Sequence, residues 1–376
     1  MLPDFRLETY FSKWEFAARY HMCASDMESI SVADLLQMAD EDDLAAWNEQ
    51  RLGYTESYGA PALRMAIADT YENMRAENIL AFAGAQEGIF AAMHVLLDAK
   101  DHAIVITPNY QSAETIPMSI CEVTGVALNP DNAWHLCLDE IRAAIRPNTK
   151  LISINFPHNP TGKVLARDDY DGLIDLAREQ GIYIFSDEVY RLLERSESIR
   201  LPQIADVYER GLSLNVMSKS YGLPGLRIGW IATSDLDILG RMERAKHYLS
   251  ICNSGPSEIL TIIALNARQQ LLERNRKIID DNLALLGSFF AEFSDIFDWT
   301  VPDGGCIGYP RYKGADGVEN FCKRLVEDAG VLLLPASIYC SELNSAPTDR
   351  FRIGFGRCGL AAGLAEMRSH LHKKAA

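Results

Sequence analysis

The sequence lacks several features that would place it in common classes of protein. No apolar run approaches the roughly 18 residues of a membrane-spanning helix. The stretch from Met1 to Glu8 has neither the basic region nor the apolar region of a signal peptide. The eight cysteines form no C-x-x-C pair and have no nearby histidine cluster. We therefore expect a cytoplasmic protein with reduced thiols, no metal site and no membrane contact.

Positive charge is also scarce. The chain has 36 lysines and arginines against 52 aspartates and glutamates, so its formal net charge is −16 and its pI is about 5.0. Nucleic-acid binding requires a basic face, so we expect no nucleic-acid partner. The glycine pattern of a dinucleotide-binding unit is missing as well. The 376 residues, 48% of them apolar, suit a large globular domain with a smaller one.

An alternation of apolar strands and amphipathic helices runs from residue 100 to residue 233. A helical spacing of apolar residues begins at Tyr170 and is stopped by Gly181. Short apolar or β-branched segments predict strands at 103–107, 150–155, 183–186, 212–216 and 228–233. This order favours an α/β fold with a mainly parallel sheet and helices on both faces.

One lysine stands in an unusual place within this alternation. Lys219 lies in a turn-rich, otherwise uncharged segment between the apolar runs 212–216 and 228–233. An ammonium group among small and apolar residues loses solvation, so its pKa falls and the amine can attack a carbonyl. Lys219 is therefore a candidate for Schiff-base chemistry. The alternative is a turn lysine that faces water.

The residues around Lys219 resemble the lysine signature of the class I and II aminotransferases, which are pyridoxal 5'-phosphate (PLP) enzymes of fold type I. The matching residues are Ser218-Lys219 followed by Gly222-Leu223-Pro224-Gly225-Leu226-Arg227-Ile228-Gly229. The resemblance implies that Lys219 carries the cofactor, and that Ser218 and Arg227 bind its phosphate. It also implies a smaller α+β domain formed by the N-terminal and C-terminal segments.

Two further motifs resemble the same family. In the run Pro157-His158-Asn159-Pro160-Thr161-Gly162, Asn159 corresponds to the asparagine that donates to the phenolate oxygen of the cofactor and lies near the substrate. Asp187 and Tyr190 resemble the Asp-x-x-Tyr of the family. An acid at the end of a buried strand requires a partner, and the protonated ring nitrogen of PLP would be one.

Two segments are candidates for contacts with the phosphate and the ring. Gly84-Ala85-Gln86 opens a predicted helix that extends to Leu97, and backbone N–H groups at such a helix start can bind an anion. The alternative is an ordinary helix start. Tyr110 follows the predicted strand 103–107 at its carboxyl end, where it can stack on a flat ring. A core tyrosine is the competing interpretation.

Two residues distant from these motifs also resemble the family. Arg352, on the predicted strand 351–355, is either an edge residue or an inward anion clamp, and it resembles the arginine that binds the substrate carboxylate. Tyr54 resembles the tyrosine that reaches the phosphate of the neighbouring subunit. The resemblance thus implies a homodimer with composite active sites. Ala24-Ser25-Asp26 stands where family members carry a glycine-containing substrate loop, and it does not match that loop.

The same observations predict the domain organisation. We expect an N-terminal arm at 1–50 that is part of the small domain, a large PLP-binding domain at 51–270 and a C-terminal small domain at 271–376. A long helical pattern at 272–293 would link the two domains.

The predicted activity is an aminotransferase that moves an amino group between an amino acid and a 2-keto acid. The alternative is a PLP-dependent lyase or cyclase, such as a carbon–sulfur β-lyase or an enzyme resembling capreomycidine synthase, because the same cofactor can serve either reaction. Aminotransferase-like domains also occur in DNA-binding regulators. The acidic balance and the lack of a helix-turn-helix pattern before Tyr54 argue against that class.

Overall fold

A seven-stranded sheet forms the centre of this computed structural model, which describes residues 2–375. The strand order is β2-β8-β7-β6-β5-β3-β4, and β8 runs antiparallel to both of its neighbours while the other pairs are parallel. The strands are β2 (Ile79–Phe82), β3 (His102–Thr107), β4 (Glu122–Ala127), β5 (Thr149–Asn155), β6 (Tyr183–Asp187), β7 (Gly211–Val216) and β8 (Gly229–Ala232).

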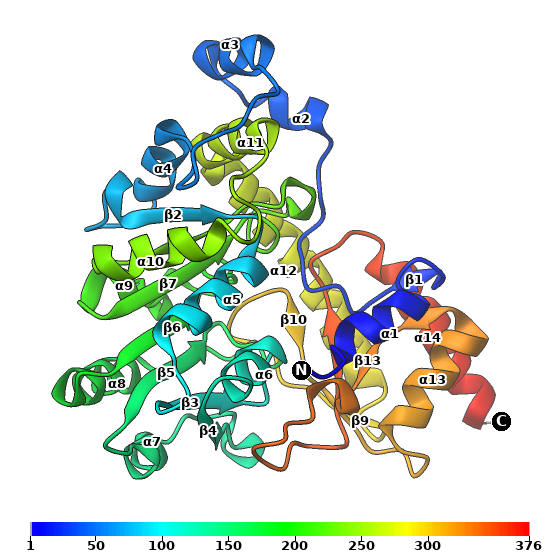
Figure 1. The fold of residues 1–376 in the computed structure, drawn as a ribbon. Helices are drawn as coiled ribbons and strands as arrows, with labels where there is room; N and C mark the ends of the chain where they lie inside the picture. The colour runs from blue at the N-terminus through cyan, green and yellow to red at the C-terminus, as the bar shows by residue number, and fades with distance from the viewer. Residues whose placement is uncertain (1, 376) are drawn as a thin grey trace.

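Helices cover both faces of this sheet, as the sequence predicted (Figure 1). Alternate residues of a strand point to opposite faces, so Phe185 packs on one side while Ile184 packs on the other. One face is covered by α5 (Ala85–Leu96), α6 (Ser112–Met118) and α10 (Leu236–Lys246). The other is covered by α4 (Pro61–Ala68), α7 (Leu138–Ala144), α8 (Arg167–Gln180), α9 (Ile204–Val207) and α11 (Gly255–Asn266).

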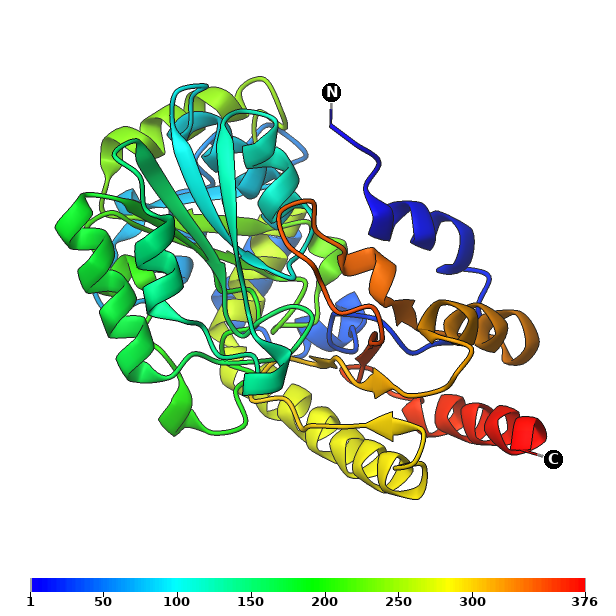
Figure 2. The same ribbon diagram turned by 90° about the horizontal axis from the view of Figure 1, so that it is seen from below.

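A smaller α+β part lies beside the large sheet (Figures 1 and 2). The 25-residue helix α12 (Arg268–Glu292) leads into it from the large part. Its strand β14 (Phe351–Gly354) pairs with β10 (Ile307–Gly308) and β13 (Leu334–Pro335). The remaining elements are β9 (Phe297–Asp298), β11 (Arg311–Tyr312), β12 (Val331–Leu332), α13 (Val318–Ala329) and α14 (Leu360–Ala375).

The first fifty residues divide between the two parts. Helix α1 (Arg6–Trp14) lies beside the C-terminal elements, and β1 (Tyr20–His21) pairs with β12. Helices α2 (Val32–Leu36) and α3 (Glu41–Glu49) pack on α11 of the large part instead. The segment that we predicted as one arm therefore has two halves with different neighbours. Within residues 2–375, no helix has the length and apolar character needed to cross a membrane.

Strand β8 and helix α5 meet at a contact that only glycine allows. A Cβ atom on Gly229 would lie 2.8 Å from the backbone nitrogen of Ala85 and 2.9 Å from the carbonyl carbon of Gly84. Backbone atoms cannot move aside as a flexible side chain can. The start of α5 is therefore fixed against the sheet by the absence of a side chain at this position.

This contact makes the effect of a single methyl group predictable. We expect Gly229→Ala to lower the free energy of unfolding by about 1–3 kcal/mol, because overpacking a tight contact forces a backbone shift. Gly287→Ala, on α12 with nothing within 4 Å of the added Cβ, is the control and should raise stability by up to about 1 kcal/mol. Denaturant unfolding of both variants measures the difference. Equal stability of the two variants would contradict the proposed contact.

Candidate active site

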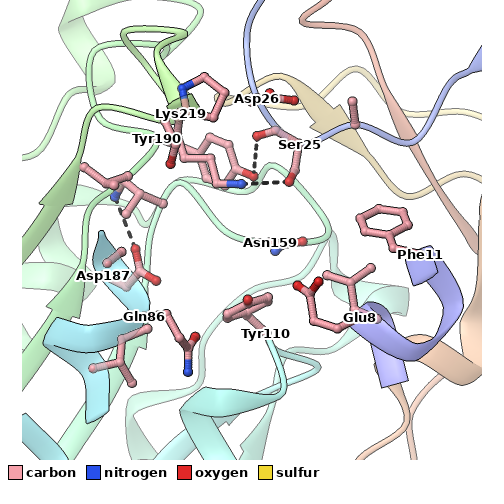
Figure 3. Close-up of a pocket in the computed structure, with 18 of the residues that line it drawn as sticks. Glu8, Phe11, Ser25, Asp26, Gln86, Tyr110, Asn159, Asp187, Tyr190 and Lys219 are labelled. Atoms are coloured by element: carbon pink, nitrogen blue, oxygen red, sulfur yellow. Dashed lines mark hydrogen bonds between the residues drawn. The ribbon is translucent and has the colours of Figure 1, made fainter. Parts of the chain in front are cut away.

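A cavity of about 530 Å³ opens at the carboxyl ends of the central strands, between the large sheet and the N-terminal segment (Figure 3). Its size suits a small-molecule site. Most of the site residues predicted from the sequence line it together: Ala85, Gln86, Tyr110, Asn159, Asp187, Tyr190, Ser218, Lys219 and Arg227. Gly84 directly precedes this lining, while Arg352 and Tyr54 lie outside it.

Lys219 reaches the cavity just after β7 ends. Its Nζ donates a hydrogen bond to Oγ of Ser25 (2.8 Å), which lies 194 positions earlier in the chain. Burial lowers the pKa of the Lys219 ammonium group, although the carboxylates of Asp26 and Asp187 oppose that shift. The amine is thus more easily freed of its proton than an exposed lysine, and that favours nucleophilic or proton-transfer chemistry.

Asp187 ends β6 beside the cavity. Burial raises the pKa of its carboxyl to about 6, and this rise is opposed by a hydrogen bond from the Val189 N–H (3.2 Å to Oδ1) and by Lys219. A carboxylate in this position gains from a cationic N–H partner. The protonated ring nitrogen of the cofactor implied by the resemblance fits that requirement.

Asn159 offers a hydrogen-bond donor to the same cavity. Its Oδ1 accepts from the Tyr339 hydroxyl (3.1 Å) and from Arg352 (3.4 Å). Its backbone N–H donates to Oδ1 of Asn155 (2.8 Å), whereas its side-chain Nδ2 has no hydrogen-bond partner within the part of the chain that the structure describes. The Tyr190 hydroxyl donates to the backbone oxygen of Ser25 (2.9 Å), so its own oxygen remains an acceptor. A phenolate oxygen needs donors, so the Asn159 side-chain NH2 suits it, whereas the Tyr190 proton is already donated to Ser25.

The start of α5 and Arg227 form a cradle for an anion. Gly84 has a φ of 96° and precedes the first turn of this 12-residue helix, whose free N–H groups carry a partial positive charge. A Cβ on Gly84 would lie 2.6 Å from Nη2 of Arg227, so the guanidinium occupies the space beside the glycine. Together with the Ser218 hydroxyl, these donors fit a phosphate group.

Tyr110 lies on one side of the cavity and follows β3. Its ring centroid is 5.1 Å from that of Phe5, with the two planes tilted by 50°. Figure 3 shows the ring bordering the open space, next to Asn159 and Glu8. Burial, and then the negative charges of Glu8 and Asp187, raise its pKa. The ring thus borders the site as predicted, and it is not sealed in the core.

Arg352 points inward, so its interpretation as a water-facing edge residue is wrong. It is fully buried, and its Nε and Nη2 both donate to the backbone oxygen of Cys23 (3.2 and 2.7 Å). Its Nη1 donates to the Tyr339 hydroxyl (2.7 Å). The guanidinium is thus occupied by backbone of the N-terminal segment. A substrate carboxylate would have to replace that oxygen, so the predicted role requires a local rearrangement.

Several residues of the cavity were missed by the sequence analysis. Ser25, which holds Lys219, lies in the stretch that does not match the glycine-containing loop of the family. Glu8, Phe11 and Glu15 line the cavity from the N-terminal segment, and Arg357 comes from the segment after β14. No local pattern marks them. The sequence did contain one signal, because Arg357 follows Arg352 by only five positions and two arginines so close together suggest an anion-binding region.

The comparison with known families agrees with this geometry. Residues 23–367 match the sequence model of aminotransferase class I and II, which is most of the chain. The fold is that of a fold-type-I enzyme, and the family match implies pyridoxal 5'-phosphate as the cofactor. The chain belongs to the class I and II aminotransferase family.

Individual relatives differ in activity. A crystal structure of a PLP-dependent aminotransferase from Streptococcus suis is 31% identical, with a TM-score of 0.92 over 99% of this chain and 98% of that one. Capreomycidine synthase from Streptomyces vinaceus is 27% identical over 98% of this chain and 94% of its own length. Aspartate aminotransferase from Bacillus subtilis is 28% identical, over 79% of each chain.

The raised pKa of Asp187 gives a prediction that does not depend on turnover. In the cofactor-free chain the folded state holds this proton up to about pH 6, whereas the ordinary value is 3.8. Ionisation therefore costs the folded state up to about 3 kcal/mol, a cost that grows as the pH rises from 4 to above 6. Cofactor-free Asp187→Asn should thus be more stable than the cofactor-free wild type at pH 7.5.

This stability difference should shrink as the pH falls below 6, and denaturant unfolding at several pH values would measure it. With the cofactor bound, the effect on activity is the opposite, and the variant should be the less active of the two proteins. Turnover of Asp187→Asn should fall by several orders of magnitude, because an amide does not hold the proton on the ring nitrogen. If the wild type and the variant had equal stability at every pH, the pKa of the Asp187 carboxyl would not be raised in the folded state.

Proposed function

We propose that this enzyme is an aminotransferase that moves an amino group between an amino acid and a 2-keto acid. The observation that carries the proposal is the position of Lys219, whose Nζ lies in the cavity at hydrogen-bond distance from Ser25 and shares the space with Asp187. A buried amine with a lowered pKa can both bind a carbonyl and exchange a proton.

The other side chains of the cavity have roles that follow from their contacts. The start of α5, Ser218 and Arg227 would hold the phosphate, and Asp187 would keep a proton on the ring nitrogen. When bound, the cofactor supplies an electron sink for the bond that breaks at the substrate α-carbon. Lys219 would accept the α-proton at Nζ and return it to a different carbon. We assign to Arg352 the α-carboxylate, after release of its bonds to Cys23.

A lyase or cyclase is the second candidate, and one comparison favours it. Capreomycidine synthase matches 98% of this chain, whereas the aspartate aminotransferase of Bacillus subtilis matches 79%. The match to the synthase is thus nearly as complete as the match to the Streptococcus suis aminotransferase, which covers 99% of the chain. Such an enzyme would use the same electron sink to break a bond at the β-carbon of its substrate. It would not need a keto-acid acceptor.

A panel of amino acids added to the loaded enzyme tests the reaction type. If the enzyme is an aminotransferase, a donor should convert the cofactor to its amine form, shift the absorbance and release one equivalent of keto acid. Adding a 2-keto acid should then restore the original spectrum. Repeated turnover without any keto-acid acceptor, with ammonia or a cyclic product released, would instead establish the lyase or cyclase.

The surface around Tyr54 supports a homodimer with composite sites. Tyr54 and Tyr248 are 94% and 93% exposed, and Ile251 is also exposed. Their two loops are bonded together, since the Ser57 hydroxyl donates to the Ile251 backbone oxygen (2.7 Å). Large apolar side chains gathered on one surface are typical of an interface. We therefore propose that these loops meet a second copy of the chain, and that the dimer is cytoplasmic.

The loops of this surface are also connected to the phosphate cradle. The carboxylate of Glu87 on α5 accepts from the Ala83 N–H through one oxygen (2.6 Å) and from the Ser250 N–H through the other (2.9 Å). Ala83 directly precedes the cradle, and Ser250 stands between Tyr248 and Ile251. Through Glu87, the proposed interface would lie one side chain away from the proposed phosphate cradle.

The composite site can be tested with two inactive variants. If Tyr54 of one chain serves the site of the other, then Tyr54→Ala and Lys219→Ala fall on different chains of one site. Mixing the two homodimers under exchange conditions should form hybrids in which one site carries both defects and the other carries neither. Activity should rise above the average of the parents, with mass spectrometry confirming hybrids. Hybrids without this rise would place Tyr54 in its own chain's site, or in none.

A further inference from the structure

The wall of the cavity that faces Lys219 is made by the N-terminal helix. Glu8, Phe11 and Glu15 line the cavity from α1 and the residue after it. Figure 3 shows Glu8 and Phe11 on the side opposite Asp187, with the Glu8 side chain directed into the space beside Tyr110. The groups that would hold the cofactor come from other elements. This wall is therefore positioned to contact the distal part of a substrate.

The wall carries more negative charge than its neighbours neutralise. The third carboxylate of this region, Asp26, is paired with Arg357 through two hydrogen bonds (3.1 and 2.8 Å). The Glu8 carboxylate has no hydrogen bond or ion pair to any side chain or backbone group described within residues 2–373. Glu15 lies 4.0 Å from His21, but burial lowers the pKa of that histidine to about 4, so it is neutral at pH 7.

The cations nearest in sequence are directed elsewhere. The Arg6 guanidinium donates to the backbone oxygen of Cys340, and the Lys13 ammonium lies 4.4 Å above the ring of Trp14. Burial, followed by the charge of Glu8, raises the pKa of the Glu15 carboxyl, as expected where two carboxylates share one region. Arg357 opposes this rise in part, but its hydrogen bonds go to Asp26, so among the described residues neither Glu8 nor Glu15 forms an ion pair with a lysine or an arginine.

The same wall offers apolar and aromatic surface. Phe5 and Phe11 line the cavity along with the two carboxylates. An aliphatic chain can pack on such rings, and a cation near a ring face gains further attraction. A substrate with a second carboxylate would instead bring like charges together at Glu8. The wall thus combines an apolar path with an anionic end.

From this arrangement we propose that the substrate is an amino acid with a cationic side chain, a guanidinium or an ammonium group, which Glu8 and Glu15 bind on the α1 wall. The inference rests on the proposed function, because it takes the cavity as the site of an amino-acid substrate. Glu8 and Glu15 are specificity residues in this account, and the chemistry at the α-carbon remains with Lys219 and Asp187.

Pairs of ligands that match in shape and differ in charge provide the test. Arginine and citrulline form one pair, and lysine and norleucine form another. Dissociation constants come from the cofactor absorbance of the holoenzyme, and the change in melting temperature gives a second readout that requires no reaction. The cationic member of at least one pair should bind about tenfold or more tightly, as a charge-assisted hydrogen bond predicts.

Glu8→Gln and Glu15→Gln, made separately, assign the preference to the wall. Each should reduce the discrimination within the preferred pair several-fold while leaving the affinity for its neutral member unchanged. Glu41→Gln on α3 is the matched control, because it removes the same charge from an exposed position outside the cavity. Circular dichroism checks that each variant is folded. If both variants fold and both still prefer the cationic ligand as strongly as the wild type does, Glu8 and Glu15 do not bind the substrate cation.

The outcomes separate this inference from the proposed function. If no amino acid alters the cofactor absorbance, the proposed function fails, and the melting temperatures still show whether cationic ligands are preferred. If neutral and cationic members bind equally well and both react, the proposed function stands and the cationic substrate is excluded. A preference for glutamate over arginine would exclude it as well.

Discussion

The segment 22–28 holds the two parts of the molecule against each other, and the site depends on it. On one side the Gly354 N–H of β14 donates to this segment (2.8 Å). On the other side Ser25 accepts from both Lys219 and Tyr190. The contact is so close that a Cβ on Gly354 would lie 1.9 Å from a backbone oxygen of the segment. One wall of the pocket is therefore the backbone of segment 22–28, which is held by contacts to both parts of the molecule.

Segment 22–28 forms hydrogen bonds with two side chains that a substrate would need, those of Lys219 and Arg352. The Lys219 amine is bonded to Ser25, and the Arg352 guanidinium is bonded to the backbone oxygen of Cys23. A carboxylate that binds Arg352 must exchange with that oxygen, so the net gain is smaller than a bidentate ion pair would give in isolation. The affinity for any substrate therefore includes the cost of releasing these internal bonds. It is a property of the segment as well as of the charged residues.

Local patterns in the sequence predicted five of the seven strands of the large sheet and did not predict β2 or β4. Most of the cofactor-side groups came from the resemblance to the family. The predicted strand 183–186 appears as β6, and Gly181 ends α8 with a φ of 65° because that backbone conformation suits glycine. Lys219 stands out because a charge interrupts an apolar region. Ser25 and Glu8 could not be found in this way. Ser25 meets Lys219 across 194 positions, and Glu8 lines the cavity beside residues from distant segments, and such contacts leave no periodic or local signal.

The two hydrogen bonds of Glu87 have a thermodynamic consequence. One carboxylate oxygen steadies the backbone before the phosphate cradle, and the other steadies the loop of Ser250. Anything that fixes one end of this bridge reduces the conformational freedom of the other end. If a second chain docks on that loop, cofactor affinity and subunit affinity become linked quantities, and each changes the other by the same factor. The concentration of free cofactor would then regulate the assembly of the enzyme.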